Sequence, residues 1–225
     1  MSLLQELQTI TERTYQHGSG IKLEKFVIGH RRYRDLSSRA TPEAQQLSSI
    51  ARTFFRVMGN RLYLAIYYSD PMIAALEKHD PRRGLNEQNI YPFIVFIEEL
   101  DHAIHGALKF RSGERNVRHE DFVRDLELLA KIDIYYTLKF FMAYFNKSRQ
   151  LENWDRLWLR HHLFERWEFT YRDATLRHRY SETSRLGEKF TRYLDGLQPE
   201  HRLQEIRRFR TLDYAAKRQY VIMLP

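Results

Sequence analysis

Residues 121–145 form the stretch that most constrains how this chain can fold. From Leu126 onward the stretch is apolar on nearly every face, and Glu127, Lys131 and Asp133 are set into it. A helix that is hydrophobic all round is normally buried in the middle of a protein. The sequence therefore predicts a central helix at 121–145, with the other helices packed about it.

A second helix is expected just before this one, at residues 92–110. It opens with an apolar run at 93–97 and becomes polar at 98–105. Apolar residues at helical spacing predict the remaining helices. These lie at 1–16, 70–78, 151–179, 181–194, 199–209 and 211–223.

One further helix is predicted from Thr41 to about Tyr68. Thr41 can cap its start, Pro42 suits the first turn, and apolar side chains recur at helical spacing. We therefore predict an all-α, single-domain bundle of about seven or eight helices, with 41–225 as the main bundle. Residues 1–40 are expected to form an N-terminal appendage, in which 21–28 is a short strand or an extended arm.

Composition narrows the classes of protein that the chain can belong to. The 225 residues are 43% hydrophobic, contain no cysteine and carry a formal net charge of +8. The hydrophobic fraction supports a sizeable core, and the lack of cysteine excludes disulfides and thiolate metal sites. No signal-like N-terminus or long uncharged apolar run is seen, so we expect a soluble cytoplasmic protein without a membrane span. The positive charge favours anionic partners.

Familiar catalytic signatures are missing, which leaves carboxylate and imidazole groups on helices as the candidates for chemistry. The chain lacks phosphate-binding glycine loops, GxSxG and His-Glu-x-x-His. Iron, manganese or zinc would suit ligands of these two types. The candidate ligands lie on three predicted helices and are Glu99, His102, Glu127, His161, Glu165 and Glu168.

Glu99-Leu100-Asp101-His102 resembles the Glu-x-x-His half-site of ferritin-like di-iron carboxylate proteins. The approximate spacing to Glu127 and then Glu165 is similar to that pattern. The resemblance implies a helical bundle whose core binds metal. The His161-x-x-x-Glu165 spacing is likewise similar to one helix of hemerythrin-like sites. The chain differs in having no acidic residue at 47–69 and in carrying Glu165-x-x-Glu168 where a second Glu-x-x-His belongs.

Structural interpretations compete with the metal hypothesis. On a helical wheel, Glu98, Asp101, His102 and His105 cluster opposite the apolar face, as expected for an ordinary solvated face. Glu127 precedes Lys131 by four residues, the favourable order for an intrahelical ion pair. The third group, His161, Glu165 and Glu168, is equally compatible with a buried polar network that includes Arg172.

Two alternative functions involve no catalysis. Arginines mixed with aromatic residues suit nucleic-acid binding, because arginine binds phosphates and aromatic rings stack on bases. The candidate residues for this role are Arg31, Arg32, Arg34, Arg207, Arg208 and Arg210. A protein-interaction module is the other alternative, in which the 14 tyrosines and the apolar C-terminal residues dock a partner or a second copy. The sequence assigns no substrate to any of these functions.

Overall fold

The structure, a computed structural model, describes residues 1–41, 47, 49–166 and 171–225. These residues are mostly helical, with nine α-helices and a small three-stranded sheet. The helices are α1 (Leu3–Tyr15), α2 (His30–Ser37), α4 (Asp70–Lys78), α5 (Ile90–Arg111), α6 (Glu120–Phe145), α7 (Asn153–Arg160), α8 (Ala174–Asp195), α9 (Pro199–Thr211) and α10 (Tyr214–Met223). The strands are β1 (Val27–Ile28), β2 (Ala51–Met58) and β3 (Arg61–Tyr68).

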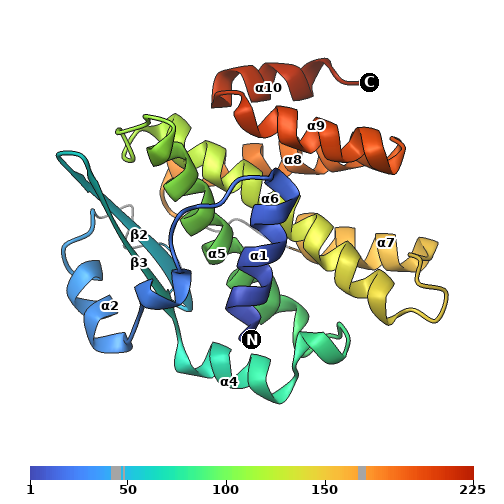
Figure 1. The fold of residues 1–225 in the computed structure, drawn as a ribbon, viewed down its shortest axis with the longest axis horizontal. Coiled ribbons are helices and arrows are strands. Elements are labelled where there is room, and N and C mark those ends of the chain that lie inside the picture. The colour runs from blue at the N-terminus through green and yellow to red at the C-terminus, as the bar shows by residue number, and fades with distance from the viewer. Residues whose placement is uncertain (42–46, 48, 167–170) are drawn as a thin grey trace.

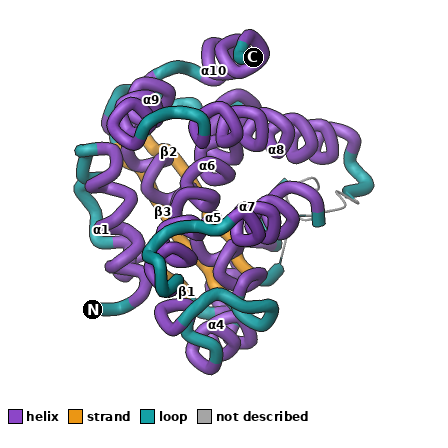
Figure 2. Tube along the Cα trace, turned by 90° about the vertical axis from the view of Figure 1, so that its right-hand side faces the viewer, coloured by secondary structure: helices purple, strands orange, loops and turns teal. Residues whose placement is uncertain are grey.

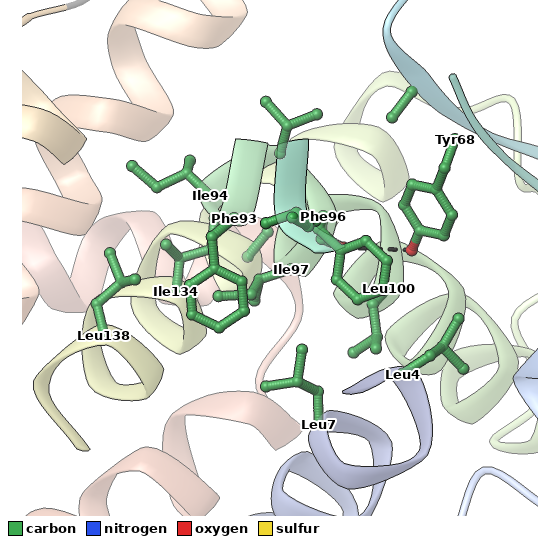
Figure 3. Close-up of a cluster of buried hydrophobic side chains, with 14 of the residues drawn as sticks. Leu4, Leu7, Tyr68, Phe93, Ile94, Phe96, Ile97, Leu100, Ile134 and Leu138 are labelled. Atoms are coloured by element: carbon green, nitrogen blue, oxygen red, sulfur yellow. Dashed lines mark hydrogen bonds between the residues drawn. The ribbon is translucent and has the colours of Figure 1, made fainter. Parts of the chain in front are cut away.

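The predicted central helix is confirmed, because α6 runs through the middle of the molecule (Figure 1). It packs along α5, and both helices are buried over most of their length. Figure 3 shows the cluster that they share with α1 and β3, where the Tyr68 hydroxyl donates to the Phe96 carbonyl (3.2 Å). Leu4 and Leu7 of α1 belong to this cluster, so the N-terminal helix packs directly on the central pair.

The helix predicted from Thr41 to Tyr68 is wrong over 51–68, where the chain forms an antiparallel hairpin of β2 and β3. Gly59 sits at the tight turn with φ +55°, a conformation that favours glycine. The segment is rich in aromatic and β-branched residues, which suit strands. Residues 42–46 and 48, which belong to the predicted start of that helix, lie outside the described residues.

Helix α5 covers one side of the hairpin, and its contacts with β2 favour strands in this segment. The Thr53 hydroxyl donates to the Glu99 carbonyl (2.9 Å), and the Phe55 ring lies directly over Gly106 of α5. A Cβ atom at residue 106 would lie 2.4 Å from that ring, so the close approach requires glycine. The small sheet is thus stabilised by tertiary contacts that a local periodicity cannot reveal.

The alternative of a short strand at 21–28 is confirmed only for its end. Val27 and Ile28 form β1 and pair in parallel with Ile66 and Tyr67 of β3. The residues before them form a single 3₁₀ turn, Leu23–Phe26. The fold is therefore not purely α-helical.

The single helix predicted at 151–179 is also wrong, because residues 171–173 are not helical; residues 167–170 lie outside the described residues. Helix α7 ends at Arg160 and continues as one π-helical turn, His161–Glu165, while α8 begins at Ala174. The Asp173 side chain accepts a hydrogen bond from the Leu176 amide (2.9 Å) and so caps α8. Trp154 is 79% exposed, which shows that the tryptophan-bearing face of α7 is not wholly buried.

A second hydrophobic cluster lies where α8, α9 and α10 meet α6. Figure 2 shows these three helices at one end of the molecule, with α4 at the other. Phe190 of α8 and Phe209 of α9 stack at its centre, with ring centroids 3.9 Å apart. In the described parts of the chain, no helix combines the length and apolar character needed to cross a bilayer.

Candidate metal centre

The polar residues of α5 and α6 meet inside the protein instead of facing water. Asp101 and His105 are 0% and 1% exposed, so the interpretation of their helix face as solvated is wrong. Helix α6 covers this face from one side, and α1 contacts α5 as well. Two clusters of these buried polar groups, centred on Asp101 and on His102, combine carboxylates with an imidazole.

The Asp101 cluster consists of Asp101, His105 and Asp133. One carboxylate oxygen from each aspartate and one imidazole nitrogen all lie within 4.8 Å of one another. Asp101 and His105 are four residues apart on α5, so they project from the same face of the helix. Asp133 comes from α6, where it is 6% exposed. This buried group could hold a metal ion.

Only part of the hydrogen-bonding capacity of the Asp101 cluster is used. His105 Nε2 lies 2.8 Å from Asp133 Oδ2, and the Tyr15 hydroxyl donates to Asp133 Oδ1 (2.5 Å). The Thr11 hydroxyl makes a long contact of 3.4 Å with Asp101 Oδ1. Asp101 Oδ2 is buried without a hydrogen-bond partner among the described residues. Such an atom costs roughly 1–3 kcal/mol unless a proton or a cation binds it.

The electrostatics of this cluster favour an added positive charge. Burial, reinforced by the neighbouring Asp133 carboxylate, raises the pKa of Asp101 well above its usual range. Burial also raises the pKa of Tyr15, again helped by Asp133. The Tyr15 hydroxyl therefore stays protonated and donates a hydrogen bond to Asp133. Two carboxylates and one imidazole are ligands typical of iron, manganese and zinc.

The His102 cluster contains three of the residues predicted from sequence, Glu99, His102 and Glu127. His102 Nδ1 lies 3.7 Å from a Glu99 oxygen, and His102 Nε2 lies 3.5 Å from a Glu127 oxygen. The two carboxylates thus face opposite nitrogens of one ring. Because the two nitrogens point in different directions, the three side chains cannot all reach one ion as they stand. The arrangement is that of an imidazolium between two carboxylates.

The pKa of His102 agrees with this charged state. Burial is the largest single influence and lowers the pKa, but the Glu127 and Glu99 carboxylates together outweigh it and raise the pKa well above its usual range. Burial in turn raises the pKa of Glu127, but His102, Lys131 and a hydrogen bond from Tyr180 lower it overall. Lys131 pairs with Glu98 across the helices (3.0 Å), whereas the sequence predicted Glu127 as its partner.

We expect the stability of the protein to depend on pH through His102. A histidine whose pKa is raised in the folded state stabilises the fold, and this contribution is fully present below the unfolded-state pKa of about 6.5. That contribution is lost as the pH rises through the folded-state value. Urea unfolding with chelator present, from about pH 6 to about pH 9, should show the wild type losing more stability than His102→Gln. Parallel losses in the two proteins would argue against a charged His102.

The remaining predicted ligands lie elsewhere. His161 and Glu165 have side chains 56% and 57% exposed, and they contact each other at 3.4 Å. They belong to no buried network of the kind that the sequence suggested. Glu168 lies outside the described residues. It is the neighbouring His162 that is buried, with Nε2 2.9 Å from Glu87.

The arginines proposed for nucleic-acid binding do not share one surface. Arg31, Arg32 and Arg34 belong to α2, whereas the other three belong to α9 on the opposite side of the molecule (Figure 1). Several make contacts within the protein: Arg207 Nε donates to the Thr14 carbonyl (2.7 Å), and Arg208 pairs with Glu205 (2.9 Å). Nucleic-acid binding by these residues stays a prediction.

Asp101, His105 and Asp133 were not selected as ligands from the sequence. Two signals could have found them: the Asp101-x-x-x-His105 spacing on one helix, and an aspartate set into the most apolar helix of the chain. Tyr15, which completes the cluster, is 118 residues away from Asp133 and gave no local signal. Comparisons with protein-family models, with curated proteins and with solved structures gave no match.

Proposed function

We propose that this protein binds a divalent transition-metal ion, iron, manganese or zinc, through Asp101, His105 and Asp133. The observation that carries the proposal is the convergence of three buried ligand atoms within 4.8 Å. One of them belongs to Asp101, whose Oδ2 atom is buried without a hydrogen-bond partner among the described residues. The ligands come from two long packed helices, which form a rigid scaffold for a metal site.

The charge balance of the cluster supports a cation more than a simple hydrogen-bonded network. Asp101 and Asp133 share one histidine, and neither has a lysine or arginine within ion-pair distance in the described part of the chain. Asp125, another buried aspartate of α6, differs in having two cationic partners, because Lys109 and Lys217 both form ion pairs with it. The fold thus offsets the Asp125 carboxylate with two lysines, whereas no lysine or arginine pairs with the Asp101 cluster in the described part of the chain.

Three protein ligands would leave coordination positions open for water or a substrate. A metal ion held in this way supplies Lewis-acid or redox chemistry, so hydrolytic or O₂-linked reactions are the classes to examine first. The role of the chain would be to orient the ligands and exclude bulk water. Tyr15, which donates to Asp133, would hold that carboxylate in place from outside the ligand set.

Elemental analysis of protein purified without chelator tests the proposal. After incubation with iron, manganese and zinc, the wild type should contain nearly one ion per chain. Asp101→Asn and His105→Gln should lose the ion, whereas Glu165→Gln, a surface carboxylate variant, should retain it. Circular dichroism establishes that each variant remains helical. Metal-free wild type after all three incubations would refute the proposal.

A further comparison locates the ion. If Glu127→Gln loses the metal while Asp101→Asn keeps it, the ion belongs to the His102 cluster and the proposed ligand set is wrong. The two clusters lie on the same pair of helices, so this control is the closest match that the chain offers.

A further inference from the structure

A pocket of about 410 Å³ opens beside the C-terminal end of α5 and has a strongly positive lining. Its charged or titratable lining residues are Arg111, Arg210 and His17, and no acidic residue lines it in the described part of the chain. Nothing in the proposed metal function uses these residues. Its volume lies within the range of small-molecule sites.

Backbone groups, and not carboxylates, hold Arg111 in place. Its Nη1 donates to the Gly18 carbonyl (2.6 Å). Gly20, at φ +78°, lies so close that a Cβ atom there would be 2.8 Å from Arg111 Nη1. The loop after α1 therefore closes directly onto the guanidinium. A neutral carbonyl orients this group without cancelling its charge.

Arg210 is likewise without a counter-ion. Its guanidinium lies over the Tyr15 ring, 5.5 Å from the ring centroid, and its buried Nε has no hydrogen-bond partner among the described residues. No carboxylate lies within 4.0 Å of Arg111 or Arg210 in the residues that the structure describes. Their neighbour Arg208 differs, because it pairs with Glu205 at 2.9 Å. Two guanidinium groups with unused donors thus line one pocket.

The end of α5 does not cancel this positive character. The last carbonyls of a helix carry partial negative charge and would repel an anion. Here, however, the Leu108, Lys109 and Phe110 carbonyls accept hydrogen bonds from the backbone amides of Ser112, Glu114 and Gly113. Each of these carbonyls therefore already accepts a hydrogen bond, which reduces the partial negative charge that it presents to the pocket.

We propose that this pocket binds a phosphate group between Arg111 and Arg210. Guanidinium groups match phosphate oxygens with paired N–H donors, and two of them balance the two negative charges of a phosphate. The volume exceeds the needs of the ion alone, so the phosphate group of a small phosphorylated molecule fits the pocket as well. The proposal is independent of the metal centre, although Tyr15 contacts both sites through its ring and its hydroxyl.

Isothermal titration of the full chain with inorganic phosphate tests this proposal. Arg111→Gln and Arg210→Gln should each weaken binding by about tenfold or more, as expected when a hydrogen-bonded charge is removed. Arg61→Gln, an exposed arginine at the tip of the hairpin, removes the same charge and should leave the affinity unchanged. Arg111→Gln keeps the Arg210–Tyr15 contact, so it remains informative if Arg210→Gln fails to fold.

Glycerol phosphate serves as a second ligand. Tighter binding of this ester than of inorganic phosphate would identify a phosphorylated small molecule as the ligand class, and equal affinities would identify the free ion. No binding of either ligand, or equal binding by wild type and both pocket variants, would overturn the proposal. Asp101→Asn should lose metal but bind phosphate normally, which separates failure of this proposal from failure of the metal proposal.

Discussion

Replacing Asp125 with asparagine is expected to lower the free energy of unfolding by about 3–5 kcal/mol. Asp125 is wholly buried on α6, and Lys217 of α10, also wholly buried, lies 2.7 Å from it. Lys109 contacts the same carboxylate. Asparagine preserves the shape of the side chain but removes its charge. Two lysines would then share a buried site without a counter-ion.

The pKa of Lys217 shows how strongly this site depends on Asp125. Burial lowers the pKa of Lys217 to about 8, even though Asp125 acts in the opposite direction. Lys217 Nζ also donates to the Arg210 and Leu212 carbonyls (3.2 and 2.6 Å), and these bonds remain in the variant. The expected loss therefore measures the carboxylate charge and not the whole polar site.

Urea unfolding followed by circular dichroism at neutral pH measures this loss. Asp35→Asn is the matched control, because Asp35 pairs with Arg32 at the surface (3.2 Å) and its side chain is 52% exposed. Surface ion pairs contribute about 0–1 kcal/mol, so the control should remain within that range. Equal stabilities of Asp125→Asn and Asp35→Asn would contradict the assigned role of Asp125.

Truncating Phe190 to alanine should lower the free energy of unfolding by about 3–5 kcal/mol. Phe190 is 0% exposed and stacks on Phe209 with ring planes 22° apart. It lies in the cluster that joins α8, α9 and α10 to α6. Alanine leaves a cavity that only rearrangement of these helices would fill, and the lost contacts include Tyr220 of α10.

Two further variants make this measurement specific. Phe140→Ala removes a ring that is 56% exposed on α6, and its effect should stay below about 1 kcal/mol. Phe209→Ala combined with Phe190→Ala should cost less than the sum of the single variants, because the two rings contact each other. Additive losses would show that the stacked pair is not an energetic unit.

Local sequence patterns predicted those helices whose apolar faces and end signals agree. The central helix predicted at 121–145 and the short helix predicted at 70–78 are confirmed, the latter with proline in its first turn. The hairpin at 51–68 was missed because its apolar residues also satisfy a helical spacing. Such a spacing does not distinguish a helix from a pair of strands where packing against another helix, here α5, favours the strands. The non-helical residues 171–173 were missed for a related reason, since apolar residues recur on both sides of them.

The candidate site was predictable in its location but not in its membership. The sequence predicted a site between the helices at 92–110, 121–145 and 151–179. Glu99, His102 and Glu127 of the first two do lie near one another, whereas His161 and Glu165 of the third are exposed elsewhere. The sequence assigned Asp101 and His105 to a solvated face, because one helix alone does not reveal what covers it. Asp133 and Tyr15 cover that face, and they come from two other helices.

The sequence by itself determined which segments must be buried, because the free energy of removing apolar side chains from water depends mainly on the side chains themselves. It also determined the absence of thiolate chemistry and the excess of positive charge. Only the tertiary structure decided which polar groups are buried with them. That choice depends on contacts between residues far apart in the chain, such as the contacts of Tyr15 with Asp133 and with Arg210, and no local spacing encodes those contacts.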